Sequence, residues 1–116
     1  MRVAGFGFRQ GAALASFQAA LDAVGGADAL ATVEDKLTGL TPLARATGLP
    51  LIPVTRADLQ AHARPGSARV TALYGTGSVA ESAALAAAGP GATLTIPRVT
   101  SPDGQVVAAI AEGQGP

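Results

Sequence analysis

Small residues dominate this chain and limit how it can fold. Of its 116 residues, 27 are alanine and 15 are glycine, while Phe, Tyr and Trp together make up only 3%. A chain of this length has room for one domain. Because large side chains are scarce, we expect a core of small and aliphatic residues, with helices and strands packed closely together. Hydrophobic residues amount to 48% of the sequence, which is typical of a chain that folds.

Charged residues are few and balanced, which argues against several classes of partner. Eight basic and eight acidic residues give a formal net charge of zero, and they are scattered along the chain. We therefore expect no binding to nucleic acid or to a membrane surface. The run Met1–Phe8 lacks the basic leader and cleavage site of a secretion signal. No apolar stretch reaches the roughly 20 residues of a membrane span, so we expect a cytoplasmic protein.

Metal and thiol chemistry find little support in the composition. The chain contains no cysteine and one histidine, His62. A structural zinc site needs several such ligands, and a thiol nucleophile needs a cysteine. We therefore expect no metal and no cofactor.

Short apolar runs alternate with helical patterns along the chain. Strands are expected at 2–8, 29–33, 51–54, 93–97 and 105–111. One helix is expected to begin at Gly11 and another to lie between Thr41 and Gly48. Two more are expected after Thr55 and after the capping box Ser78-Val-Ala-Glu81. Residues 67–74 fit a strand or a helix, and the spacing of Val70, Leu73 and Tyr74 favours a helix.

This order of elements predicts a single three-layer α/β/α domain. Its sheet would have five strands, mostly parallel, and would end in an antiparallel C-terminal hairpin. We expect the domain to span residues 1–112 and residues 113–116 to form a frayed tail.

The strand ends predict where a ligand would bind. In a mostly parallel sheet, ligands bind beyond the carboxyl ends of the strands. Gly7, Phe8, Arg9 and Gly11 follow the first expected strand, Lys36 follows the second, and Arg98 follows the fourth. The three cations could meet on one rim, where glycines would let an anion approach backbone N–H groups. We therefore predict an anion-binding rim.

The glycines have a second possible explanation. The spacing of Gly5, Gly7 and Gly11 differs from the dinucleotide-binding fingerprint, so it is a weak nucleotide signal. Packing of a helix against a strand would require small residues at the same positions. From the residues alone, both interpretations stay open.

Three further residues invite a chemical role. Lys36 is the only lysine beside seven arginines, which suggests a use for its amine, although a solitary solvated lysine is the favoured interpretation. Glu81 could act as a general base, but its place in the capping box with Ser78 favours helix capping. The chain shows no Ser-His-Asp order and no paired-carboxylate spacing.

Five stretches carry a resemblance to a known family: Gly5–Gly11, Leu30–Lys36, Thr47–Leu51, Gly77–Leu85 and Val106–Ala111. In order and spacing they resemble the CobE/CbiG C-terminal-domain family of cobalamin biosynthesis, and residues 78–81 match most strongly. The resemblance implies a three-layer α/β fold. In CbiG-type proteins this domain is the C-terminal part of an enzyme that opens the δ-lactone of cobalt-precorrin-5A and releases acetaldehyde. The present chain looks like the free-standing CobE type of the aerobic pathway.

Two positions depart from the family pattern. Many relatives carry an acidic residue shortly after the lysine, whereas residues 37–40 contain none. A lysine is common where Arg98 stands, and a guanidinium differs from an ammonium in geometry. Hydrolase chemistry therefore does not transfer directly.

The resemblance implies a tetrapyrrole ligand. Precorrins are apolar macrocycles fringed with carboxylates, so Arg9, Lys36 and Arg98 would pair with the fringe while Phe6 or Phe8, with Leu37 and neighbouring aliphatic residues, would cover the ring. Ser78 and Glu81 would complete the binding set. The leading hypothesis is a carrier or accessory factor that binds a precorrin intermediate. The alternatives are a lactone hydrolase assisted by Glu81 or Ser78, a small anion- or nucleotide-binding module, and a piece of a complex with other cobalamin-biosynthesis enzymes. A homo-oligomer is also possible.

Overall fold

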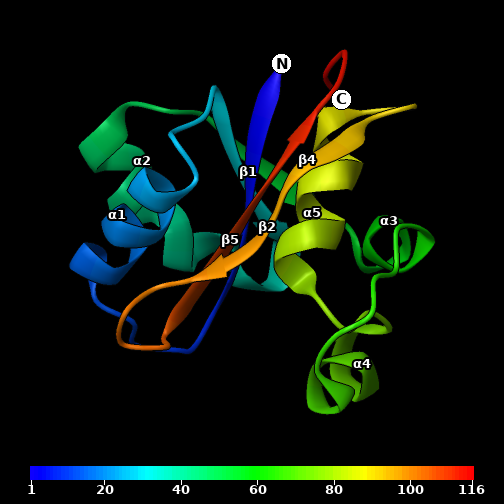
Figure 1. Ribbon diagram of the computed structural model, residues 1–116, viewed down its shortest axis with the longest axis horizontal. Helices are drawn as coiled ribbons and strands as arrows, with labels where there is room; N and C mark the ends of the chain where they lie inside the picture. Colours follow the sequence, from blue (N-terminus) through cyan, green and yellow to red (C-terminus); the bar gives the residue numbers. More distant parts are fainter.

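A five-stranded sheet runs through the middle of the protein, as the computed structural model of residues 1–116 shows (Figure 1). Strands β1, β2 and β3 pair in parallel, while β5 pairs antiparallel with both β1 and β4. The sheet order is β3-β2-β1-β5-β4, where the strands are β1 (Arg2–Phe8), β2 (Ala29–Val33), β3 (Leu51–Val54), β4 (Thr93–Thr100) and β5 (Val106–Glu112). The sheet is therefore mixed, and only β5 runs against the other four strands.

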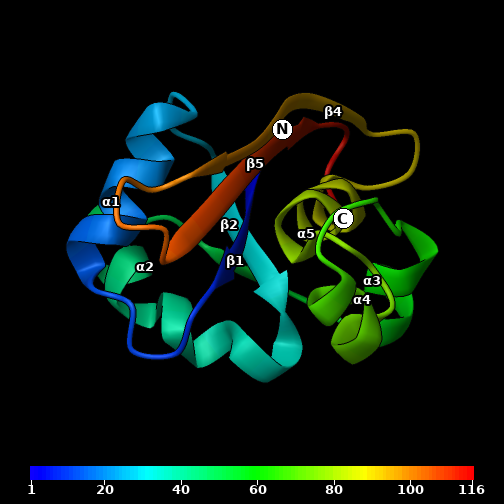
Figure 2. The same ribbon diagram turned by 60° about the horizontal axis from the view of Figure 1, so that its bottom comes forward.

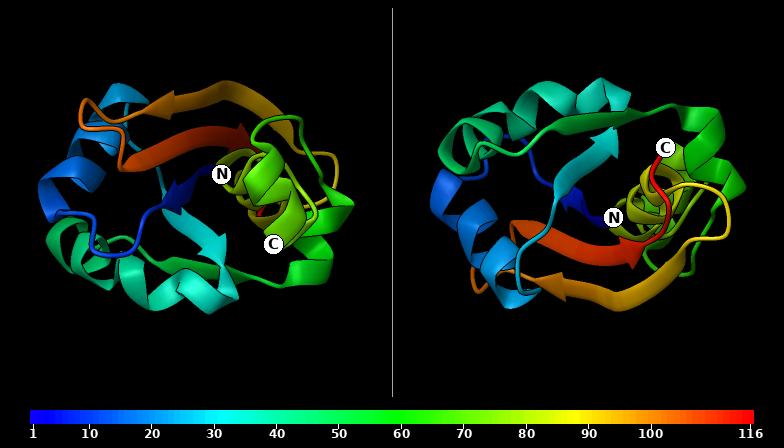
Figure 3. Two further views of the ribbon diagram at one scale, coloured as in Figure 1. Left: turned by 90° about the horizontal axis from the view of Figure 1, so that it is seen from below. Right: turned by 90° about the horizontal axis from the view of Figure 1, so that it is seen from above.

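Helices cover both faces of the sheet (Figures 2 and 3). Helices α1 (Leu14–Ala23) and α2 (Thr41–Thr47) lie on one face, and α3 (Arg56–Ala61) and α5 (Val79–Ala88) lie on the other. The 3₁₀ helix η1 (Glu34–Leu40) follows β2. The expected three-layer α/β architecture is confirmed.

Residues 68–74 form helix α4, which projects from the body of the molecule (Figure 1). Ser67 is its N-cap, and the Ser67 hydroxyl accepts a hydrogen bond of 3.3 Å from the Val70 N–H. Gly75 ends the helix in the left-handed conformation, with φ of +73°. The helical interpretation of this segment is confirmed.

Small residues let α5 lie directly on the sheet. Eight of its ten residues are buried. Gly5 of β1 faces this helix so closely that an added Cβ would lie 2.5 Å from the Ala84 nitrogen and 2.9 Å from the Ala84 Cβ. On the opposite face, the rings of Phe6 and Phe17 lie 6.1 Å apart within a second apolar cluster. Small residues therefore allow the close packing of α5 on the sheet.

Several element boundaries differ from the sequence expectation, and that of β5 differs by one residue at each end. Helix α1 begins at Leu14 and not at Gly11, because Gly11 occupies a turn with φ of +82°. Strand β4 continues through Pro97 to Thr100. An edge strand tolerates this proline, which falls in the register shift between Ile96 and Val99, where no β5 partner is paired with it. Arg98 therefore lies within β4 and not after it.

The chain ends lie side by side, where β1 begins and β5 ends. The Met1 amine donates to the Gly113 carbonyl over 2.7 Å, and the Gly113 N–H donates to the Met1 carbonyl over 3.0 Å. Further along the segment expected to fray, the Gly115 N–H donates to the Ala88 carbonyl over 2.9 Å. None of the helices is both long and apolar enough to cross a membrane.

Asp103 links the β4–β5 turn to helix α1 and gives a prediction for acid stability. Its carboxylate accepts from the Ser101 hydroxyl at 2.6 Å, from the Ser16 hydroxyl, and from the Gln105 N–H at 3.1 Å. These bonds, that of Ser101 first, lower the pKa of Asp103 below its ordinary value of 3.8. Stabilisation from a lowered pKa is present above the ordinary value and is lost as pH falls through the folded-state value.

We therefore expect the free energy of unfolding to fall below about pH 4, and Asp103→Asn to reduce that fall. Urea unfolding at pH 7, 4 and 3 measures the free energy of unfolding of both proteins. Asp22→Asn is the matched control, because Asp22 is exposed and its side chain makes no hydrogen bond. Equal acid sensitivity of both variants would contradict the assignment.

Candidate functional site

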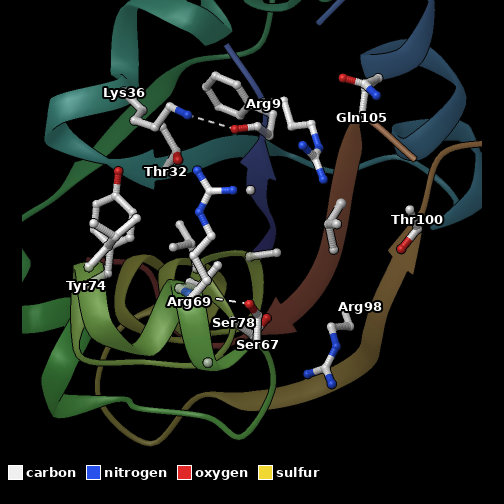
Figure 4. A pocket seen from close by; sticks show the side chains of 18 of the residues that line it. Arg9, Thr32, Lys36, Ser67, Arg69, Tyr74, Ser78, Arg98, Thr100 and Gln105 are labelled. Carbon is white, nitrogen blue, oxygen red and sulfur yellow. Dashed lines mark hydrogen bonds between the residues drawn. The ribbon is translucent and has the colours of Figure 1, made fainter. Parts of the chain in front are cut away.

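A cleft of about 760 Å³ opens where the carboxyl ends of β1 and β2 face helices α4 and α5 (Figure 4). Strand β1 and its following loop contribute Gly7, Phe8 and Arg9. The N-terminus of α5 forms the far side of the cleft, and β4 with the β4–β5 hairpin closes one flank. The lining comprises Gly7, Phe8, Arg9, Gln10, Thr32, Lys36, Ser67, Arg69, Val70, Leu73, Tyr74, Gly77, Ser78, Val79, Ala80, Arg98, Thr100, Gly104, Gln105 and Val107.

The cleft brings together the three cations predicted from the strand ends. Arg9, Lys36 and Arg98 all line it, and Arg69 of α4 adds a fourth cation. No carboxylate is among the lining residues, although the whole chain has no net charge. Half of the eight basic side chains therefore surround one hollow, an arrangement that favours an anionic ligand, although Arg98 shares its charge with Glu81 behind the cleft.

Two of these cations have no partner within the protein. The side chains of Arg9 and Arg69 make no hydrogen bond and no ion pair, and both residues are exposed. Figure 4 shows the Arg69 guanidinium extending from α4 across the cleft toward the side where Thr32 and Lys36 lie. Both guanidinium groups can therefore form hydrogen bonds to an anionic ligand without first breaking an internal bond.

Lys36 is held in place at the rim. Its Nζ donates to the Phe8 carbonyl over 2.7 Å and lies 4.7 Å from the centre of the Phe8 ring. Partial burial lowers the pKa of Lys36 below that of a solvated lysine. An ammonium has three donors, so Lys36 keeps further donors for a ligand while its position is fixed.

Glu81 lies behind the cleft and not in its wall. Its side chain is 4% exposed and accepts from the Arg98 N–H over 3.1 Å and from Arg98 Nη1 over 3.2 Å. Arg64 Nε lies 3.5 Å away on the same carboxylate. The carboxylate therefore orients Arg98 rather than facing a ligand.

Ser78 lines the cleft and caps α5. Its hydroxyl accepts a hydrogen bond of 3.2 Å from the Glu81 N–H, which is the expected N-cap bond. The reciprocal half of the capping box is missing, because the Ser78 N–H donates to the Thr76 hydroxyl over 3.4 Å and the Glu81 carboxylate turns to Arg98. The sequence pattern thus marks the start of the helix correctly but not the partner of Glu81.

The glycines near the end of β1 have different roles. Gly5 permits the approach of α5. Gly7 lines the cleft, where an added Cβ would lie at an ordinary 3.7 Å from the Ala80 nitrogen. Gly11 lies outside this cleft, in a smaller adjoining hollow of about 300 Å³ that also touches Lys36. Of these three glycines, only Gly7 lines the cleft.

Helix α4 supplies the lining residues that sequence reasoning missed, chiefly Arg69 and Tyr74. Helical spacing indicated a helix there, but nothing in the pattern indicated that it would face the strand ends. Thr32 was missed for another reason: it lies fully buried within β2, and its hydroxyl donates to the Phe6 carbonyl over 2.8 Å. No group of three or more His, Cys, Asp or Glu side chains is placed to hold a metal ion.

A family model described as "Cobalamin synthesis G C-terminus" matches residues 2–111. This chain belongs to the CobE/CbiG family of cobalamin biosynthesis proteins. Its solved structural relatives include CobE, described as a protein from the cobalamin (vitamin B12) biosynthetic pathway, with a TM-score of 0.79 and 28% identity over 100% of this chain and 92% of that one.

A second solved relative in the CobE/CbiG family is the cobalamin biosynthesis protein chiG from Agrobacterium tumefaciens. It has a TM-score of 0.73 and 36% identity, over 98% of this chain and 99% of that one. A comparison with curated proteins found no match. The family suggested by the five sequence stretches is therefore confirmed, together with its fold.

Proposed function

We propose that this family member binds a carboxylated precorrin or corrin-ring intermediate in the cleft, as a carrier or accessory factor. The observation that carries the proposal is the charge of the lining: four cations and no carboxylate. Such a ring carries several carboxylates around its edge, so cations on separate walls can each meet one of them. The cleft volume of about 760 Å³ lies within the range of small-molecule sites, about 300–1,000 Å³.

The apolar part of the lining supports a macrocycle over a small anion. Phe8 and Val107 lie on the sheet side, Val70 and Tyr74 on α4, and Val79 at the start of α5. Exposed charge pairs contribute only about 0.2–1 kcal/mol each, so contact with the ring must supply much of the affinity. A small carboxylate or phosphate would leave these apolar groups unused.

The hydrolase alternative has less support from the side chains expected to assist it. The Glu81 carboxylate is buried against Arg98 and Arg64, and the Ser78 hydroxyl accepts the capping bond of α5. No histidine and no carboxylate lines the cleft beside Ser78 to activate its hydroxyl. Binding is therefore the function that the site favours.

An absorbance titration tests the proposal with two corrins. A cobyrinic-acid-type corrin carries free carboxylates, and its fully amidated counterpart has the same ring without them. We expect the carboxylated corrin to bind at micromolar protein and to bind more weakly as salt rises, because salt screens exposed charges. Unchanged absorbance and no co-elution on gel filtration would overturn the proposal, and equal affinity for the amidated ring would overturn the role of the cations.

Arg9→Gln should weaken binding of the carboxylated corrin about 2- to 5-fold, because it removes one unpaired guanidinium from the rim. Arg45→Gln is the control, since Arg45 is exposed on α2 and does not line the cleft. Dissociation constants from the same titration measure both variants. A loss of affinity in Arg45→Gln equal to that in Arg9→Gln would mean that net charge matters and not the cleft.

A further inference from the structure

Helix α4 belongs to a loop that closes on itself at a narrow neck. The Ser67 N–H donates to the Gly77 carbonyl over 2.9 Å, and the Gly77 N–H donates to the Arg64 carbonyl over 2.7 Å. The two backbones lie so close that a Cβ on Gly77 would be 2.7 Å from the Pro65 carbonyl carbon. Arg98 Nη1 adds a bond of 2.9 Å to the Pro65 carbonyl. We call residues 67–75, beyond this neck, the α4 arm.

The α4 arm is weakly attached to the rest of the protein. None of its helical residues is buried, and only Val70 and Tyr74 are even partly covered. Leu73 is 57% exposed. Segments with few buried apolar contacts open at low free energy, so the arm should move more readily than the sheet and α5.

Besides the packing of Val70 and Tyr74 on the apolar cluster beneath α5, the far end of the arm is bound by Arg56 of α3. Its guanidinium pairs with the Asp35 carboxylate of η1, donates to the Leu73 carbonyl over 3.0 Å, and lies 4.9 Å from the centre of the Tyr74 ring. Arg56 therefore joins the last turn of α4 to η1, the element that carries Lys36. This attachment ties the two walls of the cleft together at one point.

Arg69 is the group that the arm brings to the cleft. It is unpaired, it stands on the wall opposite β1, and it points across the opening (Figure 4). Arg9, Lys36 and Arg98 stand on the loop after β1, on η1 and on β4, so only Arg69 would move with the arm.

We infer that the α4 arm is a movable wall that retains the bound ring, with Arg69 as its ligand-binding residue and Arg56 as the positioning residue that sets its place. This inference rests on the proposed function for the identity of the ligand. It predicts that both residues act chiefly on the rate at which ligand leaves. Most differences in affinity among variants of one site are differences in dissociation rate.

The first experiment measures the arm without ligand. Because the chain has no cysteine, Ala72→Cys gives a single site for a nitroxide label on the exposed side of α4, and Ala46→Cys on α2 gives a control site. We expect Arg56→Ala to sharpen the electron paramagnetic resonance lines at position 72 and to leave those at position 46 unchanged. Identical spectra at position 72 with and without Arg56→Ala would overturn the attachment.

The second experiment measures dissociation of the carboxylated corrin by stopped-flow dilution. Arg69→Gln should raise the dissociation rate up to about 5-fold, and Arg56→Ala should raise it as well. In the double variant, the increase in dissociation rate should be smaller than the product of the two single increases, because Arg56 acts through the arm that carries Arg69. A merely structural role of Arg56 would give independent effects.

The outcomes separate the two proposals. If the corrin binds and Arg69→Gln leaves its dissociation rate unchanged, the arm inference is wrong and the proposed function stands. If the wild-type protein binds no corrin, the proposed function fails and so does the role of Arg69. The label spectra decide the attachment by Arg56 in either case.

Discussion

Gly5→Ala is expected to destabilise the protein by about 3 kcal/mol or more, or to prevent folding. The new Cβ would lie 2.5 Å from the Ala84 nitrogen and 2.9 Å from the Ala84 Cβ, and it would overlap the Ala80 carbonyl oxygen. These atoms belong largely to the backbone of α5 and cannot rotate away. The helix, which contacts four strands besides β1, would have to shift as a whole. Urea unfolding followed by circular dichroism measures the loss.

Gly7→Ala is the matched control for Gly5→Ala. Both glycines lie in β1, and neither has a positive φ, so the two substitutions differ in the space around the new methyl group. At Gly7 the nearest atoms lie at 3.7 Å, and we expect a change within about 1 kcal/mol. Wild-type stability of Gly5→Ala would show that α5 does not rest on β1 as described.

Glu81→Ala is expected to cost about 2–3 kcal/mol, the second largest effect. The substitution leaves the Arg98 N–H without its acceptor and removes the carboxylate that Arg64 and Arg98 share. The two guanidinium groups are 41% and 44% exposed, so water compensates part of the loss. Glu81→Gln should cost less, because an amide oxygen can still accept from the Arg98 N–H. Urea unfolding at neutral pH compares the variants.

Ligand binding distinguishes a positioning role of Glu81 from a catalytic one. If Glu81 orients Arg98, then Glu81→Gln should weaken binding of the carboxylated corrin together with stability. A general base would show the opposite pattern, with stability and binding retained and turnover of a lactone substrate lost. Glu112→Gln is the control, because Glu112 is half exposed and pairs with Arg2 only at 3.9 Å.

Local sequence patterns were sufficient where an element depends on its own residues. Strands β1, β2 and β3 have the expected bounds, and α4 follows from Ser67, Gly75 and helical spacing. Arg9 and Lys36 could be placed on the cleft because they follow parallel strands. Whether a residue follows the end of a strand can be predicted from the local sequence alone.

Features that depend on distant segments could not be predicted in the same way. Arg69 lines the cleft only because the neck at Gly77 turns α4 toward the strand ends. Glu81 was expected to complete a capping box, and the competing partner that draws its carboxylate away is Arg98, 17 residues later. Strand β4 passes through Pro97 because it lies at the edge of the sheet, which no local pattern reveals.

The pairing of Met1 with Gly113 puts both ends of the polypeptide at the end of β1 and β5 that lies opposite the cleft (Figure 1). A protein module fused to either end would extend from that side of the molecule and would leave the opening of the cleft uncovered. The same proximity makes the chain suitable for circular permutation, with a short peptide joining the old ends and new ends cut in an exposed loop.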